Sequence, residues 1–401
     1  MPWKETSVQN QRTQFIGLYM TGDYAISDLC QSFGISRKTG HKLINDFDEN
    51  GLAALEDKSR APHSHPNATP LEIEELIKEC RSKHPKWGPK KLKHILQRQC
   101  TQTNWPAPST IGEILKRRGL TVARKRRNDK GLNLPRNPVE ASGANVTWSA
   151  DFKGQFPLGN GHWCYPLTVS DAYSRMILRA QCLRQTNTQS VKPIFVAIFT
   201  EFGLPQAIRT DNGSPFASSG LGGLTPLAVW WMRLGIRLDR IEKAHPEQNG
   251  RHERMHRELK SCATPPAYDM NSQQRAFDKF RDEYNSVRPH EALGMATPAS
   301  QYVVSSRQYP IVLPEIEYPE GMIIRRVRHD GYIRWKSRML YLSAALQNEP
   351  IGLDQLDDHH IAIYYGTMPL AILDSSTCEL LPRQRATDML KHLLEEKTWV
   401  P

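Results

Sequence analysis

The sequence contains no C-x-x-C pair, no apolar run of membrane-spanning length and no apolar signal-peptide core near its start. Its seven cysteines are scattered and odd in number, which indicates reduced thiols rather than a disulfide framework or a zinc cluster. The longest apolar stretches, such as PIFVAIF at 193–199, have the length of buried core elements, whereas a spanning helix needs about 20 residues. We therefore expect a cytoplasmic protein that is not anchored in a membrane.

Acidic residues are in deficit, because 42 Asp and Glu stand against 53 Lys and Arg and give a formal net charge of +11. A chain of 401 residues with this balance predicts about two to four domains and a polyanionic partner. Nucleic acid and an anionic membrane surface both satisfy the charge. The absence of an apolar anchor favours nucleic acid.

Residues 1–60 follow the pattern of a helix-turn-helix domain. Apolar residues recur at helical spacing from Val8 to Tyr19, and two shorter helices are expected on either side of Gly34. Ser36 can cap the third helix, on which Ile44 would pack inward. The first turns of this helix present the candidate DNA contacts Arg37, Lys38, His41 and Lys42. The alternative is a three-helix bundle with a basic, solvated face.

A linker that includes PHSHP at 62–66 leads into a second helical segment, residues 66–127. The two linker histidines have no cysteine nearby at ligand spacing, so we interpret the segment as a linker rather than a metal site. The helical segment fits a second helix-turn-helix module. It ends in basic residues suited to DNA phosphates, Arg124, Lys125, Arg126 and Arg127, although a plain solvated tail is the alternative.

The remaining chain predicts two further domains, so the fold class is multidomain α/β. Residues 138–302 contain three apolar β-rich runs and then alternate helix, strand, helix, strand and helix, which predicts a mixed sheet with helices packed against it. Residues 310–401 predict a small β-barrel with a C-terminal helix. Six residues make one strand pair of this barrel basic, and it could bind nucleic acid or protein: Arg325, Arg326, Arg328, Arg334, Lys336 and Arg338.

Two aspartates follow apolar runs that are expected to be strands of one sheet. Asp151 follows VTWSA, and Asp211 follows AIRT, directly before the turn-forming NGS. Each alone is commonly only a turn former. Two such carboxylates with a third from a helix suit Mg²⁺, and two ions about 4 Å apart can promote cleavage or transfer of a phosphodiester. A metal-dependent reaction at phosphodiesters is therefore the expected chemistry.

Three glutamates in AHPEQNGRHERMHRELK, residues 244–260, compete to be the third carboxylate. Glu247 lies among turn signals, and a turn holds a metal ligand poorly. If a helix begins near residue 249 or 250, Glu253 lies in its first turns, where the helix dipole favours a carboxylate. Glu258 points elsewhere and would form a surface pair with Arg254.

The helix that carries Glu253 has two expected faces. Residues three, four and seven positions after Glu253 share its side and are candidate phosphate contacts: His256, Arg257 and Lys260. Met255 and Leu259 would offer an apolar flank to the sheet. The basic residues would form a cationic rim around an acidic centre.

Several strings in this chain, SADFKG, DAYSR, TDNGSPF, NGRHERMHREL and YNSVRPHEALGMATPAS, resemble the retroviral-integrase-like DDE transposases, and most closely the IS481 group. The resemblance covers essentially the whole chain. It implies a ribonuclease-H-like core in which Asp151, Asp211 and Glu253 are the catalytic, metal-binding triad. The integrase spacing, with thirty-five residues between the second Asp and the Glu, would select Glu247, but the family pattern P-x-x-N-G-x-x-E aligns with Glu253.

The expected function is that of a DNA transposase. The resemblance implies binding to the terminal inverted repeats of an insertion sequence, then nicking and strand transfer into target DNA with Mg²⁺ or Mn²⁺, as two ions. Joining two ends requires at least a dimer on DNA, and a bacterial, nucleoid-associated protein is expected. The alternatives are a DNA-binding regulator with a vestigial core and a host nuclease or ribonuclease H. An intact triad argues against the first and the doubled DNA-binding segment against the second.

Overall fold

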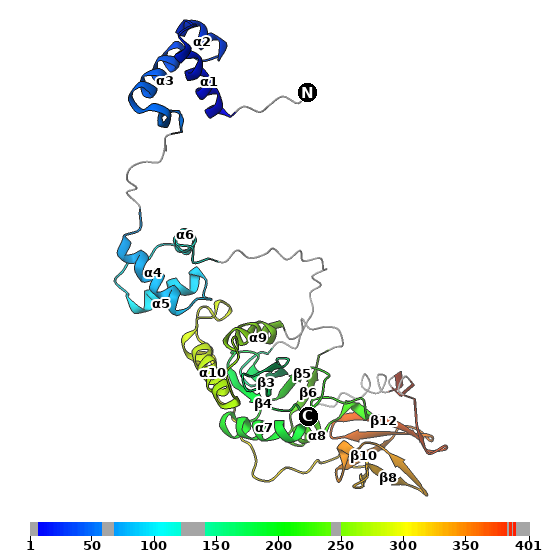
Figure 1. The fold of residues 1–401 in the computed structure, drawn as a ribbon. Coiled ribbons are helices and arrows are strands. Elements are labelled where there is room, and N and C mark those ends of the chain that lie inside the picture. Colours follow the sequence, from blue (N-terminus) through cyan, green and yellow to red (C-terminus); the bar gives the residue numbers. More distant parts are fainter. Residues whose placement is uncertain are drawn as a thin grey trace. The chain divides into compact units, whose positions relative to one another are not determined.

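The computed structural model describes residues 7–57, 68–121, 141–241 and 250–382, with residues 385, 386, 388 and 389 (Figure 1). It consists of two compact units, residues 1–71 and 72–401, which are considered separately. Glu247, the basic run Arg124, Lys125, Arg126 and Arg127, and most of the predicted C-terminal helix lie outside the described residues.

The first unit contains the three predicted helices, α1 (Val8–Thr21), α2 (Ile26–Ser32) and α3 (Arg37–Asn50), followed by a 3₁₀ turn over Gly51–Leu55. Its small core includes Phe15, Leu29 and Ile44, so the inward packing of Ile44 is confirmed. Ser36 caps α3 as predicted, because its hydroxyl accepts the Thr39 N–H at 3.1 Å. The sequence therefore predicted the helices of this unit correctly.

Gly40 allows α3 to pass close to its neighbours. A Cβ atom at this position would lie 2.3 Å from Cys30 Sγ and 3.3 Å from Phe15 Cζ. The absence of a side chain at Gly40 thus sets the distance between α3 and α2, despite the usual cost of glycine inside a helix.

The second helical module contains α4 (Leu71–Lys83), α5 (Pro89–Gln99) and α6 (Pro108–Arg117). Fully buried Ile77, Leu92 and Ile111 form the centre of its core. Glu74 is also buried, and its carboxylate accepts hydrogen bonds from Arg118 and Arg117, which hold the Glu74 pKa below its usual value despite burial. A buried carboxylate paired in this way ties the two ends of the module together.

The central domain is a mixed sheet with helices, and its elements follow the predicted order apart from the added two-residue β2. The strands are β1 (Thr147–Phe152), β2 (Phe156–Pro157), β3 (Trp163–Asp171), β4 (Ile177–Leu183), β5 (Ala207–Thr210) and β6 (Arg237–Arg240). The sheet order is β2-β3-β1-β5-β6, with β4 also paired to β3. Strands β1, β5 and β6 are parallel, whereas β3 is antiparallel to both β1 and β4.

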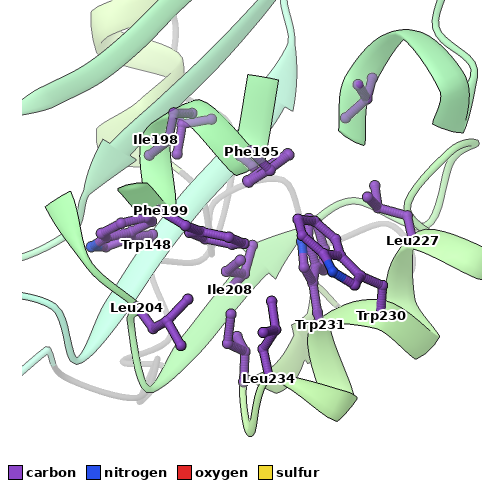
Figure 2. Packing of buried hydrophobic residues seen from close by; sticks show 14 of the residues in the cluster. Trp148, Phe195, Ile198, Phe199, Leu204, Ile208, Leu227, Trp230, Trp231 and Leu234 are labelled. Carbon is purple, nitrogen blue, oxygen red and sulfur yellow. The ribbon is translucent and has the colours of Figure 1, made fainter. Parts of the chain in front are cut away.

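Helices cover both faces of this sheet (Figure 1). They are α7 (Thr188–Phe202), α8 (Pro226–Arg233), α9 (Gly250–Cys262) and α10 (Met270–Asp282). A short 3₁₀ turn over Leu221–Gly223 precedes α8, and a π turn over Glu283–Val287, a 3₁₀ turn over Glu291–Leu293 and α11 (Pro298–Gln301) follow α10. Figure 2 shows the core under α7 and α8, where the Phe195 ring meets the Trp231 ring edge-on at 4.8 Å and Trp148 is buried beside Phe199. On the other face, Met255 and Leu259 of α9 pack with Phe277 of α10, as the sequence predicted for the apolar flank of α9.

Helix α8 is apolar on nearly all sides because it belongs to two cores. Its Leu227, Trp230 and Trp231 pack into the core with Trp148. Its Ala228 and Val229 join the apolar cluster of the C-terminal strands. A helix without a polar face is expected where both of its sides are buried.

The described C-terminal strands do not confirm the predicted closed barrel. They are β7 (Ile323–Arg326), β8 (Tyr332–Trp335), β9 (Arg338–Tyr341), β10 (Pro350–Gln355), β11 (His360–Tyr365), β12 (Met368–Asp374) and β13 (Glu379–Leu380), with a 3₁₀ turn over Ala344–Leu346. Within the described residues, β13-β12-β11-β10-β7 form an open antiparallel sheet and β8-β9 a separate hairpin. The six basic residues lie exposed on or beside β7 and this hairpin, rather than on one strand pair.

Cys164 of β3 and Cys182 of β4 lie side by side. The neighbouring strands bring their Cα atoms to 5.8 Å and their sulfur atoms into direct contact, which the sequence did not predict. Cysteines 18 positions apart on a hairpin meet because the register places them there, which their spacing alone does not reveal.

Candidate catalytic site

Asp151 and Asp211 lie at the same edge of the central sheet. Strands β1 and β5 are parallel, with Ser149 opposite Arg209, and each aspartate lies two residues beyond this pair. The carboxyl ends of adjacent parallel strands therefore bring the two aspartates side by side, as the sequence predicted. Asp211 is exposed, and its Oδ1 accepts the Gly213 N–H at 3.1 Å, so it also forms the turn that follows β5.

Glu253 lies in the first turn of α9, which begins at Gly250, close to the predicted start. Its side chain is exposed, and so are those of Arg257 and Lys260 on the same helix. These two cations are placed where the sequence expected them.

The electrostatics of Asp151 link the three carboxyl groups. The pKa of Asp151 is raised to about 7, first by burial, then by the negative charge of Asp211, with a smaller contribution from Glu253. The Phe152 N–H and the charge of Lys153 oppose this rise. A proton or a cation beside the partly buried Asp151 carboxylate would relieve this repulsion.

Two histidines of α9 contact β3 directly beside Asp151. His252 and His256 are 3% and 1% exposed. Their Nε2 atoms lie 2.7 and 2.5 Å from Thr168 Oγ1, and His252 Nδ1 lies 2.9 Å from Ser170 Oγ. His256 Nδ1 lies 3.6 Å from Asp151 Oδ2. His256 is therefore not at the surface, which corrects its assignment as a phosphate contact.

The inward direction of these histidines follows from a pattern in the sequence of α9. His252, Met255, His256 and Leu259 occupy positions i, i+3, i+4 and i+7, which is the buried stripe of an amphipathic helix. Histidines at two of these four positions predict a buried polar contact, and here the partners are the hydroxyls of β3.

Glu258 has a different partner from the one predicted. Its carboxylate pairs with the guanidinium of Arg288, just beyond the π turn, and both side chains are largely buried. The Arg288 guanidinium also lies 5.7 Å from the centre of the Tyr284 ring. Glu258 thus fastens α9 to the segment after α10 and takes no part in the acidic cluster.

The donor set beside Asp151 fits a divalent cation. One ligand atom each from Asp151, His252 and His256 lie within 4.8 Å of one another. Burial lowers the pKa of His252 to about 3 and of His256 to about 2, so both rings are neutral near pH 7 and retain lone pairs. Carboxylate oxygens from Asp211 and Glu253 add hard ligands of the kind that Mg²⁺ and Mn²⁺ take.

The DNA-contact candidates of α3, namely Arg37, Lys38, His41 and Lys42, all have exposed side chains. The α3 helix thus presents a basic surface at its first turns. None of the helices among the described residues has the length and apolar content that crossing a bilayer requires.

Comparisons with known families and proteins agree with this architecture. Models described as "Integrase core domain" match residues 141–246 and 234–298, a "Helix-turn-helix domain" model matches 11–63, and a "Homeodomain-like domain" model matches 39–115. Residues 141–298 of this chain thus match an integrase core domain. The two core matches together span the strands and helices that carry Asp151, Asp211 and Glu253.

Relatives of this chain include products of bacterial insertion elements. An uncharacterized 31.7 kDa protein of insertion element IS407 from Burkholderia multivorans is 26% identical over 67% of this chain and 87% of its own length. An uncharacterized 39.2 kDa protein of IS476 from Xanthomonas euvesicatoria is 24% identical over 66% and 74%. The integrase catalytic core domain of HTLV-2, solved in complex with magnesium, is 16% identical over 40% of this chain and 99% of that domain, with a TM-score of 0.33.

Proposed function

We propose that this protein is a DNA transposase of the IS481 group, which binds the terminal inverted repeats of its element and catalyses metal-dependent nicking and strand transfer. The observation that carries the proposal is that Asp151 and Asp211 lie at the carboxyl ends of adjacent parallel strands, with Glu253 of α9 near enough for its charge to raise the Asp151 pKa. The acidic cluster lies in a chain with net charge +11 and helix-turn-helix domains. A basic protein that gathers carboxylates at one point is suited to bringing a metal to DNA.

In this proposal the three carboxylates hold two Mg²⁺ or Mn²⁺ ions, which would polarise the scissile phosphodiester and activate the attacking oxygen. Asp151 is fixed by its position in β1, between β3 and β5. Glu253 approaches from α9, which His252, Met255, His256 and Leu259 anchor on the sheet. The protein would hold the three carboxylates at fixed positions and would bind DNA so that the scissile phosphodiester lies beside them.

Positively charged residues would position the DNA. Arg257 and Lys260 lie exposed on α9 beyond Glu253 and can contact phosphates next to the cleaved bond. Helix α3 would enter a groove of the terminal repeat through its first turns. The basic run Arg124, Lys125, Arg126 and Arg127 would contact DNA phosphates. Since two element ends must be joined, the active form is at least a dimer on DNA.

The proposal is tested by a strand-transfer assay with DNA fragments from the flanks of the coding region. Wild-type protein with Mg²⁺ is expected to nick at the element boundary and to join the freed 3′ end to a target plasmid. Asp151→Asn, Asp211→Asn and Glu253→Gln should each reduce joining by at least about 10³-fold, while binding to the same DNA persists. Glu247→Gln is the matched control and should retain activity.

Other outcomes would select other functions. Binding to the flanks with no joining, and no change on Asp151→Asn, would indicate a regulator with a vestigial core. Cleavage with no preference for the flanking sequence would indicate a general nuclease. Loss of activity in Glu247→Gln with activity retained in Glu253→Gln would overturn the assignment of the third carboxylate.

A further inference from the structure

The two buried histidines of α9 have different hydrogen-bonding situations, although they lie on one face of one helix. Thr168 Oγ1 has a single hydrogen, which it donates to the carbonyl oxygen of Asp151 at 3.2 Å, because that oxygen can only accept. Both imidazole Nε2 atoms lie within hydrogen-bonding distance of the same hydroxyl oxygen. With the hydroxyl hydrogen directed at that carbonyl, we assign hydrogen to both Nε2 atoms, which then donate to the hydroxyl oxygen.

This proton arrangement fixes the role of each Nδ1 atom. A neutral imidazole with hydrogen on Nε2 has a lone pair on Nδ1. In His252 that lone pair accepts from the Ser170 hydroxyl at 2.9 Å, so the ring is fully satisfied. In His256 the Nδ1 lone pair faces Asp151 Oδ2 at 3.6 Å, and both of these atoms are acceptors. Two acceptors directed at each other need a cation or a proton between them.

The distance between these two atoms suits a shared cation. Ligand atoms that each lie about 2.1 Å from one ion are separated by roughly 3 to 3.5 Å in octahedral or tetrahedral arrangements. The His256 ring is held in place by Thr168 at Nε2, which is the arrangement that orients histidine ligands in metal sites. The side chain is 1% exposed, and its Nδ1 faces Asp151.

We infer that His256 is a metal ligand, supplying Nδ1 to the cation that Asp151 holds, and that His252 only positions the helix. This inference rests on the proposed function, since it concerns the same acidic cluster. Imidazole nitrogen favours transition metals, whereas Mg²⁺ prefers oxygen ligands and gains little from nitrogen. The site should thus discriminate in favour of Mn²⁺ over Mg²⁺ through one side chain outside the three carboxylates.

The decisive measurement is pulsed electron paramagnetic resonance of the full-length protein with Mn²⁺, which detects ¹⁴N nuclei bonded to the ion. Wild-type protein should show ¹⁴N modulation from one imidazole. His256→Gln should abolish the modulation and weaken Mn²⁺ binding roughly tenfold, with a change of less than about threefold for Mg²⁺. His252→Gln, four residues away on the same buried face, is the matched control and should keep the modulation.

Each outcome separates this inference from the transposase proposal. Bound Mn²⁺ without ¹⁴N modulation in the wild-type protein would overturn the role of His256 and leave the carboxylate site intact. Modulation that survives His256→Gln but not His252→Gln would overturn it in favour of the other ring. The wild-type spectrum alone tests the inference even if His256→Gln fails to fold. No Mn²⁺ binding at all would contradict both proposals.

Discussion

Thr168 lies directly opposite Asp151 in the antiparallel pair of β1 and β3, and its hydroxyl contacts the Asp151 carbonyl and both buried histidines of α9. The Thr168 hydroxyl thus connects β1, which carries Asp151, to α9, which carries Glu253. The contact therefore helps to hold α9, which carries Glu253, against the strands beside Asp151.

Thr168→Val tests this connection, because it keeps the shape of the side chain and removes the hydroxyl. Two buried N–H groups would lose their acceptor, at about 1–3 kcal/mol each, so we expect the free energy of unfolding to fall by about 2–4 kcal/mol. Urea denaturation measures the change, and Thr168→Ser should restore most of it. Thr200→Val, at an exposed position of α7, is the control. If the free energy of unfolding falls no more in Thr168→Val than in the control, the Thr168 hydroxyl contributes little to stability.

Gly40→Ala is expected to destabilise the first unit, although alanine normally stabilises a helix relative to glycine by about 1 kcal/mol. The new methyl group would meet Cys30 Sγ at 2.3 Å, and overpacking of this kind costs about 1–3 kcal/mol. Cys30→Ala should suppress most of the loss in the double variant, because it removes the sulfur atom. Thermal unfolding of the wild-type protein, the two single variants and the double variant measures the coupling energy between the two positions. Additive losses of stability would mean that α2 and α3 move apart and that the methyl group does not press on the sulfur atom.

Arg288→Gln should destabilise the protein more than Arg254→Gln. Arg288 pairs with Glu258 and has little exposed side chain, and removing one partner of a buried pair leaves the other uncompensated. Arg254 is exposed, so its replacement should change the free energy of unfolding by less than about 0.5 kcal/mol. Chemical denaturation measures the free energy of unfolding of both variants and shows which arginine is the partner of Glu258. Equal losses would restore the Arg254 assignment that the sequence favoured.

Stability should fall as the pH drops below about 6.5. Burial, together with neighbouring positive charges, lowers the pKa of His290 to about 3 in the folded protein, whereas an unfolded histidine has a pKa near 6.5. The unfolded state therefore binds the proton first, and the stabilisation present above pH 6.5 is lost toward pH 3, by up to about 1.4 kcal/mol per pH unit. His290→Gln should reduce this slope by about one proton, and His162→Gln, at an exposed histidine, should not. An unchanged slope in His290→Gln would contradict the burial argument.

The exposed cations of α3 should account for part of the salt dependence of DNA binding. Arg37→Ala and Lys42→Ala are each expected to weaken binding to the flanking DNA and to reduce the slope of log K against log salt by about 0.9. Lys279→Ala, at an exposed position of α10, is the charge-matched control. Filter binding or fluorescence anisotropy at several salt concentrations measures the slope. A slope that responds to Lys279→Ala but not to the α3 changes would place the DNA elsewhere.

The sequence predicted the elements that carry the candidate site because their signals are local. An apolar run followed by Asp and a turn places Asp151 and Asp211 at strand ends, and turn residues before an amphipathic run place the start of α9. The sequence did not reveal which face of α9 is buried. The buried stripe of this helix contains histidine at two positions, and polar residues occur on every side of it, so two faces could equally have packed on the sheet. For that reason His256 was expected at the surface and lies buried.

The sequence did not predict features that depend on contacts between distant segments of the chain. Whether seven short strands close into a barrel depends on their twist and pairing, and the local alternation of residues is the same in an open sheet. The contact between Cys164 and Cys182 and the pairing of Glu258 with Arg288 depend likewise on which segments the fold brings together. No pattern within a short window contains that information.

Helix α8 has a consequence for how the chain can be divided. Its eight residues close the core beside Trp148 on one side and the cluster of the C-terminal sheet on the other. Cutting the chain between the predicted domains, near residue 305, would leave Ala228 and Val229 facing water and invite aggregation. The core and the C-terminal sheet should therefore melt in a single cooperative transition, and the smallest piece that folds faithfully around the catalytic edge includes both.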